Sequence, residues 1–378
     1  MRFDINQNKF ISAAHKSIWH AALFLAPFYE VKKPDLAEAE ATDLFEGERN
    51  LCRFMQDLYL DMYNYPELYH LPVGEYDKYM NGRERKDLPH KNDPKESSLR
   101  NEFQQPIQFY QKLLFELGVH AELDYNTFRF NIDKNVFLNI LMNMRFSKIR
   151  GKKKKLLLAL NRMGLEFDGK ATDRMPVTNA KYPKMLLALS TLCKSSNNKY
   201  AFTNFLRCDF RGLIHGFKPQ FEDTMAILPG DLKSIAIKLD QFMQELGCKV
   251  SVEPLKSIVS DSRWKVNYSL NGKSIFAFCS DINRLELFAY FNYHKNVSRM
   301  GYILKDESSE LYNWFYEKIP ARLCSCKNNN LVDIGGQKKR ICGLMNRLDV
   351  GNPNSNDLKN IEEIIRIYFE RVRGLLVS

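Results

Sequence analysis

The chain has 378 residues, of which 44% are hydrophobic, 18 are Tyr and 26 are Phe. This composition excludes a disordered chain, and the length favours two domains, or one domain with a helical extension, over a single domain. The net charge of +11 permits nucleic acid or anionic ligands as partners but specifies neither.

The N-terminus and the cysteines indicate the compartment. The first ten residues, MRFDINQNKF, lack the apolar core of a signal peptide, and the apolar run 18–28 is too short to span a membrane. The eight cysteines are scattered through the chain and do not form the dense framework of a small secreted domain. We therefore expect a cytoplasmic protein with reduced thiols and no membrane partner.

Residues 1–101 are predicted to form a helical N-terminal region that ends in a long connection. One amphipathic stripe carries the prediction, and Pro66 is expected to end its helix; the stripe consists of Leu51, Phe54, Met55, Leu58 and Met62. Residues 72–101 are rich in Pro, Gly, Lys, Asp and Asn, which is typical of an exposed connection.

Residues 102–228 are predicted to form a first α+β unit. Pro106 suits a first helical turn, and Gly118 suits the left-handed residue that closes a helix before strands near 119–123 and 128–132. The same order recurs around Gly164 and Gly247. Either the two α+β units are duplicates, or any helix that ends on Gly before a strand produces this pattern.

Residues 229–378 are predicted to form a second α+β unit. Apolar and polar residues alternate over 264–270, and Asn271-Gly272 suits a type I′ turn into a return strand and a third strand over 285–291. A last amphipathic helix, capped by Asn356 and ended by Gly374, is expected to dock on this sheet. The fold class is therefore α+β, with two units of helices and antiparallel sheets between the N-terminal helical region and the docking helix.

The second unit carries a resemblance. The hairpin Trp264–Phe278, the alternating strand after it and the helix around Trp314 together resemble YdhG-like and related uncharacterised bacterial α+β domains over residues 262–316. The cysteine-bearing tail is similar to tails of uncharacterised proteins from Gram-positive bacteria. The resemblance implies a compact module of sheet and helix, and it carries over no catalytic residue.

Aromatic strands without a reaction motif favour a non-catalytic protein that binds a small molecule or a protein partner in an α+β cleft. The side chains expected to line this cleft are Trp264, Tyr268, Phe276, Phe288 and Tyr290, with Arg207, Arg211 and His215 as polar candidates. A buried ion pair beside a packed cysteine is the alternative interpretation of the segment around Arg207.

Two other function classes remain open. Two basic runs could track a phosphate backbone in a nucleic-acid-associated regulatory protein; they consist of Lys152, Lys153, Lys154, Lys155, Lys338, Lys339 and Arg340. No hydrolase elbow, phosphate loop, zinc-protease or dinucleotide motif occurs. An enzyme would therefore have to use Cys208, Asp209 and His215 as its nucleophile and acid/base candidates.

The tail offers a zinc hypothesis. Cys324, Cys326 and Cys342 could converge around the Gly335-Gly336 turn, with Cys279 or His294 as the fourth ligand of a tetrahedral site. Because the spacing is not that of paired C-x-x-C knuckles, we favour a tail that docks its apolar residues on the main sheet without metal.

Overall fold

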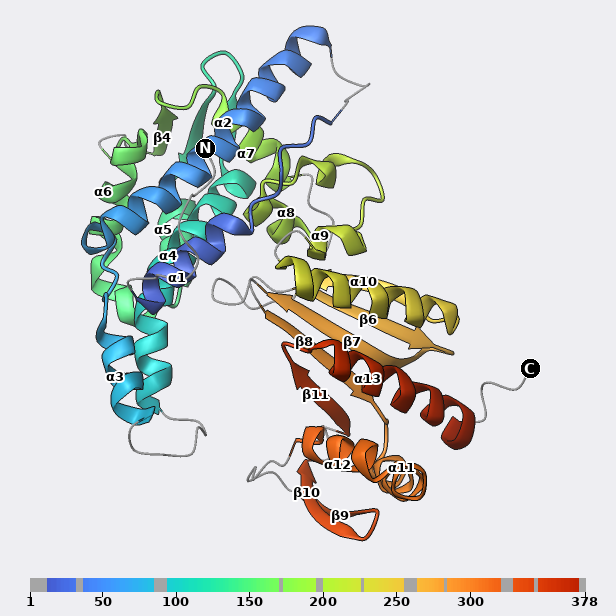
Figure 1. The fold of residues 1–378 in the computed structure, drawn as a ribbon. Helices are drawn as coiled ribbons and strands as arrows, with labels where there is room; N and C mark the ends of the chain where they lie inside the picture. Colours follow the sequence, from blue (N-terminus) through green and yellow to red (C-terminus); the bar gives the residue numbers. More distant parts are fainter. Residues whose placement is uncertain are drawn as a thin grey trace. The chain divides into compact units, whose positions relative to one another are not determined.

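The computed structural model describes residues 12–31, 37–84, 94–169, 173–194, 200–225, 228–254, 264–281, 284–320, 329–342 and 346–373. The chain divides into two compact units (Figure 1), unit 1 formed principally by Met1–Lys218 and unit 2 by Pro219–Leu255 with Arg263–Ser378. Helices and antiparallel sheets occur together in both units, which confirms the α+β class. The predicted N-terminal region 1–101 belongs to unit 1, and the predicted boundary at 228/229 lies within unit 2.

Unit 1 contains helices α1 to α8 and one four-stranded antiparallel sheet. The α-helices are α1 (Ala13–Leu23), α2 (Glu38–Asn64), α3 (Glu75–Glu84), α4 (Pro94–His120), α5 (Lys134–Asn143), α6 (Lys153–Ala159), α7 (Met185–Lys194) and α8 (Ala201–Arg207). The 3₁₀ turns are η1 (Pro66–Tyr69), η2 (Ser147–Lys152), η3 (Leu160–Met163) and η4 (Phe210–Leu213). The strands, in sheet order, are β1 (Glu122–Asp124), β2 (Arg129–Asp133), β4 (Arg174–Asn179) and β3 (Leu165–Phe167).

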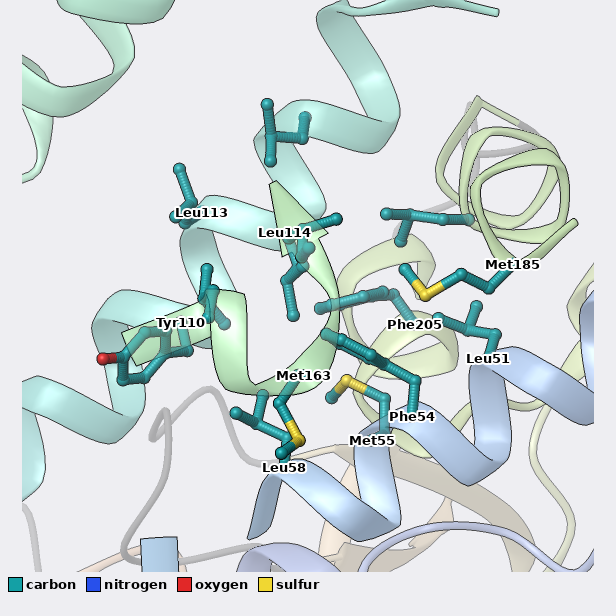
Figure 2. Close-up of a cluster of buried hydrophobic side chains, with 14 of the residues drawn as sticks. Leu51, Phe54, Met55, Leu58, Tyr110, Leu113, Leu114, Met163, Met185 and Phe205 are labelled. Atoms are coloured by element: carbon teal, nitrogen blue, oxygen red, sulfur yellow. The ribbon is translucent and has the colours of Figure 1, made fainter. Parts of the chain in front are cut away.

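The core of unit 1 forms around the predicted stripe of α2. Each stripe residue is at most 1% exposed, and Figure 2 shows four of them packed with side chains from α4 and with Met163, Met185 and Phe205. The helix ends at Asn64, and Pro66 begins η1, as predicted. Because its apolar stripe is buried in this core, the opposite face of α2 is left to the surface.

The predicted connection over 72–101 is wrong in part, because α3 and the first two turns of α4 fall within it. Pro106 does not start a helix but lies inside α4. Gly118 is not a left-handed terminator either: it is helical, and a Cβ there would lie 2.6 Å from the Sγ of Cys193 on α7. Gly118 therefore allows close approach of α4 and α7, whereas Gly164 and Gly247 have the predicted positive φ.

Unit 2 contains a five-stranded antiparallel sheet, a two-stranded hairpin and five α-helices among the residues described. The sheet order is β11 (Arg347–Gly351), β8 (Arg284–Tyr290), β7 (Lys273–Asp281), β6 (Trp264–Leu270) and β5 (Lys249–Pro254), and the hairpin is β9 (Asn329–Ile334) with β10 (Gln337–Cys342). The helices are α9 (Phe221–Met225), α10 (Gly230–Glu245), α11 (His294–Glu307), α12 (Ser309–Lys318) and α13 (Ser355–Ile367), which continues as the π-helix η5 (Tyr368–Arg373).

The predicted hairpin of unit 2 is confirmed. Asn271 and Gly272 have φ values of 51° and 73°, which is the left-handed conformation that a type I′ turn requires at both positions. The helices α10 and α13 lie side by side over the sheet (Figure 1). The docking helix is capped by Asn354, whose side chain accepts from Asn356 and Asp357, so the predicted cap at Asn356 is wrong by two positions. Gly374 lies outside the described residues.

Candidate ligand-binding groove on helix α2

An open groove of about 650 Å³ runs along the surface face of α2 in unit 1. Its lining residues come from α2 and from the segment after α1: Phe28, Thr42, Phe45, Glu46, Arg49, Asn50, Cys52, Arg53 and Gln56. The α2 members recur at intervals of three and four residues, so one face of the helix forms the groove. A volume of this size is within the range of small-molecule sites.

Local packing holds Phe28 and α2 in place at the groove. Phe28, which is 41% exposed, meets the ring of Phe45 edge-on at a centroid distance of 5.5 Å. The loop before α7 can approach α2 because Gly47 has no side chain; a Cβ there would lie 2.4 Å from the carbonyl oxygen of Lys184. Asn50 donates its side-chain amide to the carbonyl oxygen of Pro183 at 2.8 Å.

The charges of the groove are unequal. Lys184 pairs with Glu46 at 2.6 Å and with Asp43 at 2.8 Å, so the acidic side chains already share a cation. Arg49 and Arg53 are exposed, and no carboxylate among the described residues lies within ion-pair distance of either guanidinium. Arg49 lies over Phe45, with its Cζ 5.9 Å from the ring centroid. The groove therefore combines a positive charge with aromatic surface.

One thiol, that of Cys52, lines the groove, and the buried Cys208 lies next to it. Cys52 is partly exposed, and its thiol donates to the carbonyl oxygen of Cys208 with an Sγ···O distance of 4.0 Å. Cys208 ends α8 in the left-handed conformation, with φ of 50°, and is 3% exposed. The neighbouring Cys52 side chain, together with burial, raises the pKa of Cys208 well above its usual range.

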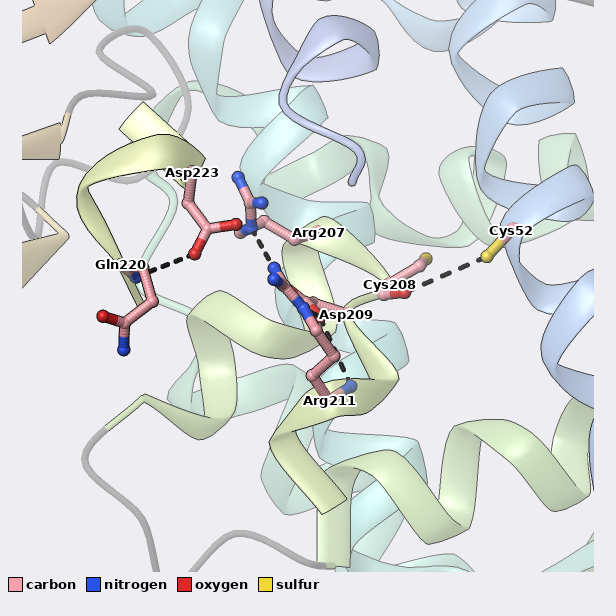
Figure 3. A network of polar contacts seen from close by, with 7 residues as sticks. All are labelled: Cys52, Arg207, Cys208, Asp209, Arg211, Gln220 and Asp223. Carbon is pink, nitrogen blue, oxygen red and sulfur yellow. Dashed lines mark hydrogen bonds and ion pairs between the residues drawn. The ribbon is translucent and has the colours of Figure 1, made fainter. Parts of the chain in front are cut away.

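A buried ion cluster lies directly after Cys208 (Figure 3). Asp209, whose side chain is 2% exposed, accepts from Arg211 at 2.8 Å and 2.6 Å, one bond to each carboxylate oxygen. Arg207, whose side chain is 5% exposed, lies 3.5 Å from the same carboxylate. The structure thus bears out the alternative interpretation of this segment, a buried ion pair beside a packed cysteine.

The segment after α1 connects this cluster to the groove. Ala26 donates its backbone N–H to the carbonyl oxygen of Arg207 at 2.7 Å. The Arg211 guanidinium lies over the ring of Tyr29, with its Cζ 3.8 Å from the centroid. These two contacts hold the chain on both sides of Phe28, one through the backbone of Ala26 and one through the side chain of Tyr29, and so support the ring at the groove.

The predicted catalytic set does not form among the described contacts. Cys208 is buried, and its raised pKa opposes the thiolate that a nucleophile needs. The carboxylate of Asp209 binds Arg207 and Arg211, while His215 is exposed and pairs with neither Cys208 nor Asp209 in any described contact. Arg207 is likewise too buried to line an open pocket.

The predicted aromatic cleft is wrong, because its five side chains do not share one face. Trp264, Tyr268 and Phe276 are 0% exposed and fill the core of unit 2. Phe288 is paired with Ala277, which points to the opposite face of the sheet from Phe276. Phe288 and Tyr290 therefore lie on that opposite face, where both are half-buried. Alternation correctly identified the two faces, but it did not show that helices cover the aromatic one.

The two basic runs are only partly available to a partner. Lys153 donates to the carbonyl oxygens of Leu141 and Met144 at the end of α5, the latter at 3.0 Å. Lys339 donates to the carbonyl oxygen of Tyr316 and lies over its ring. The exposed members are Lys154, Lys155, Lys338 and Arg340. The nucleic-acid hypothesis stays a prediction.

The zinc hypothesis falls mostly outside the described residues, since Cys324, Cys326 and the side chain of Cys342 are not among them. Within the part of the chain that is described, no group of three or more His, Cys, Asp or Glu side chains could hold a metal ion. Elemental analysis for zinc remains the direct test of the tail.

Comparisons with family models, with curated proteins and with solved structures find no match to this chain. The resemblance of residues 262–316 to YdhG-like domains therefore stays a prediction. No helix among the described residues combines the length and the apolar character needed to cross a membrane.

The sequence analysis missed the groove residues Phe28, Arg49, Cys52 and Arg53. Their local pattern is weak, because two arginines four residues apart, with Cys52 between them, also occur on ordinary solvated helix surfaces. The missing information was long-range, since Cys52 and Cys208 are 156 residues apart in sequence.

Proposed function

We propose that this chain is a ligand-binding protein whose α2 groove binds an anionic small molecule with an aromatic or other apolar part. The observation that carries the proposal is the pair Arg49 and Arg53 beside the rings of Phe28 and Phe45, in a groove of about 650 Å³. Guanidinium groups supply donors for a carboxylate, sulfonate or phosphate, and the rings supply apolar surface. This keeps the expected function class, ligand binding without catalysis, and moves its site from the sheet to α2.

The dye 8-anilinonaphthalene-1-sulfonate is a suitable probe because it joins a sulfonate to aromatic rings. Titration of the reduced protein, followed by dye fluorescence, should give saturable binding. An exposed guanidinium about 4 Å from the anion of the ligand contributes about 1 kcal/mol to the binding free energy in a high dielectric, and the groove has two such groups. The double variant Arg49→Ala/Arg53→Ala should therefore bind about tenfold or more weakly, and Phe28→Ala should also weaken binding.

Arg145→Ala is the matched control, because Arg145 is an exposed arginine of unit 1 that does not line the groove. Its dye affinity should equal that of the wild type. Equal affinities in the control and in the double arginine variant would rule out the groove as the anion site.

A further inference from the structure

We infer that Cys52 is a thiol–disulfide exchange site for an anionic low-molecular-weight disulfide, and that Cys208 is the thiol that resolves the mixed disulfide. The inference deepens the proposed function, because it rests on the α2 groove as the entry route for the anion. The product is a disulfide between α2 and the end of α8.

The Cys52 thiol contacts the backbone of Cys208, and the two cysteines differ in access. Cys52 lines the groove and is partly exposed, whereas Cys208 is 3% exposed behind it. The Cys52 sulfur lies 4.0 Å from the Cys208 carbonyl oxygen, and Figure 3 shows the Cys208 side chain directed toward Cys52. A small disulfide can therefore reach Cys52 first, whereas the buried Cys208 does not line the groove.

The groove selects the reactant by charge. Arg49 lies about one helical turn before Cys52 on α2, Arg53 directly follows it, and both line the same groove. A disulfide that carries carboxylates is attracted by these guanidinium groups, whereas an uncharged disulfide is not. Oxidised glutathione is a probe of this class.

The reaction is balanced without any other oxidant. The Cys52 thiol loses its proton and attacks one sulfur of the small disulfide; a bond forms between Cys52 and that sulfur, and the other half leaves as a thiolate that takes up a proton. The Cys208 thiol then attacks the Cys52 sulfur and releases the second half as a thiol. Overall, two protein thiols are oxidised to one disulfide, and one small disulfide is reduced to two thiols.

The position of Cys52 beside Cys208 favours this order. The first cause of the raised pKa of Cys208 is the neighbouring Cys52 side chain, and burial is the second. Once Cys52 is part of a mixed disulfide, it can no longer ionise, so this cause is removed. Burial still raises the pKa of Cys208, and the proximity of the two residues has to compensate for the low acidity of that thiol.

The test is peptide mapping by mass spectrometry after reaction of the full chain with oxidised glutathione. In the wild type, the expected end product lacks two hydrogen atoms and joins the peptides of Cys52 and Cys208. Cys208→Ser, or Cys208→Ala if the serine variant does not fold, should stop at glutathione bound to Cys52. Cys52→Ser should leave Cys208 unmodified.

The arginines test the selection by charge. The variant Arg49→Ala/Arg53→Ala should lower the rate with oxidised glutathione, relative to the rate with uncharged 2-hydroxyethyl disulfide, by about tenfold. Arg145→Ala should show the wild-type ratio. Persistence of both thiols in the wild type, a stable mixed disulfide on Cys52, or direct modification of Cys208 in Cys52→Ser would overturn the inference.

The dye titration of the reduced wild type separates the two proposals, since it involves no thiol chemistry. If dye binding depends on the arginines but no disulfide forms, the proposal of an anion-binding groove is supported and the proposal of an exchange site at Cys52 is refuted. A disulfide that forms at the same relative rate in the arginine variant would refute the groove as the entry route.

Discussion

Substitution of Tyr268 by Phe tests whether the aromatic strand residues of unit 2 are structural. The Tyr268 hydroxyl donates to Asp240 at 2.6 Å, and Gln244 donates to the other oxygen of the same carboxylate at 2.7 Å. Tyr268 is 0% exposed and Asp240 is 8% exposed, so water cannot readily replace the lost donor. A hydrogen bond to a charged group contributes about 1.5–3 kcal/mol. Tyr268→Phe should therefore lower the free energy of unfolding by about 2 kcal/mol.

The assay is urea unfolding followed by circular dichroism and tryptophan fluorescence. Tyr290→Phe is the matched control, because Tyr290 is half-buried on the other sheet face and its hydroxyl makes no hydrogen bond among the described residues. The control should change stability by less than about 0.5 kcal/mol. If Tyr268→Phe were as stable as the control, the buried bond to Asp240 would not contribute as argued.

Three further predictions concern other parts of the molecule. Gly118→Ala should lower the free energy of unfolding by about 2 kcal/mol, because its Cβ would lie 2.6 Å from the Cys193 sulfur; Gly82→Ala, which meets nothing within 4 Å, should instead gain up to about 1 kcal/mol. Burial lowers the pKa of His15 below the ordinary histidine value of 6.5, against the opposing effects of the Tyr63 carbonyl and Asp77. Lowering the pH below 6.5 should therefore destabilise the fold. Below pH 6.5 the unfolded state binds the proton more readily than the folded state, so the free energy of unfolding falls until the pH passes the lowered pKa of folded His15. The measurement is the free energy of unfolding in urea as a function of pH. A His15→Gln variant with the same pH dependence as the wild type would contradict this. If the basic runs bind nucleic acid, the wild-type protein should bind generic DNA at low salt, and the Lys154→Glu variant should bind it more weakly than the wild type. Absence of DNA binding by the wild type at low salt would exclude that function.

Local signals in the sequence were sufficient for much of unit 2. The turn Asn271-Gly272 and the alternating strands around it depend on neighbouring residues only, and the structure contains them as predicted. Gly118 shows where local signals fail: a glycine near the end of a helical pattern can be a left-handed terminator or a contact point, and only Cys193 on α7 decides between them. The same limit applies to α3, whose composition is that of a connection.

The candidate site was harder to predict than the strands of unit 2, because it forms through contacts between residues far apart in the sequence. The sequence predicted the buried stripe of α2, but its opposite face, with Arg49 and Arg53, is indistinguishable from an ordinary solvated helix surface. The groove exists because Phe28 is held beside Phe45 and because Cys208 lies against Cys52. The Arg207 segment was recognised as polar, yet only its burial in the structure identifies a structural ion cluster.

Chemical-shift mapping of the reduced protein with 8-anilinonaphthalene-1-sulfonate tests the proposed groove most directly. The account predicts that amide shifts change saturably along the groove face of α2, including Arg49 and Arg53, and at Phe28. The exposed apolar residues Leu138 and Met142 of α5, which are 47% and 67% exposed, are the alternative dye site. Shifts confined to α5, with α2 unaffected, would contradict the account.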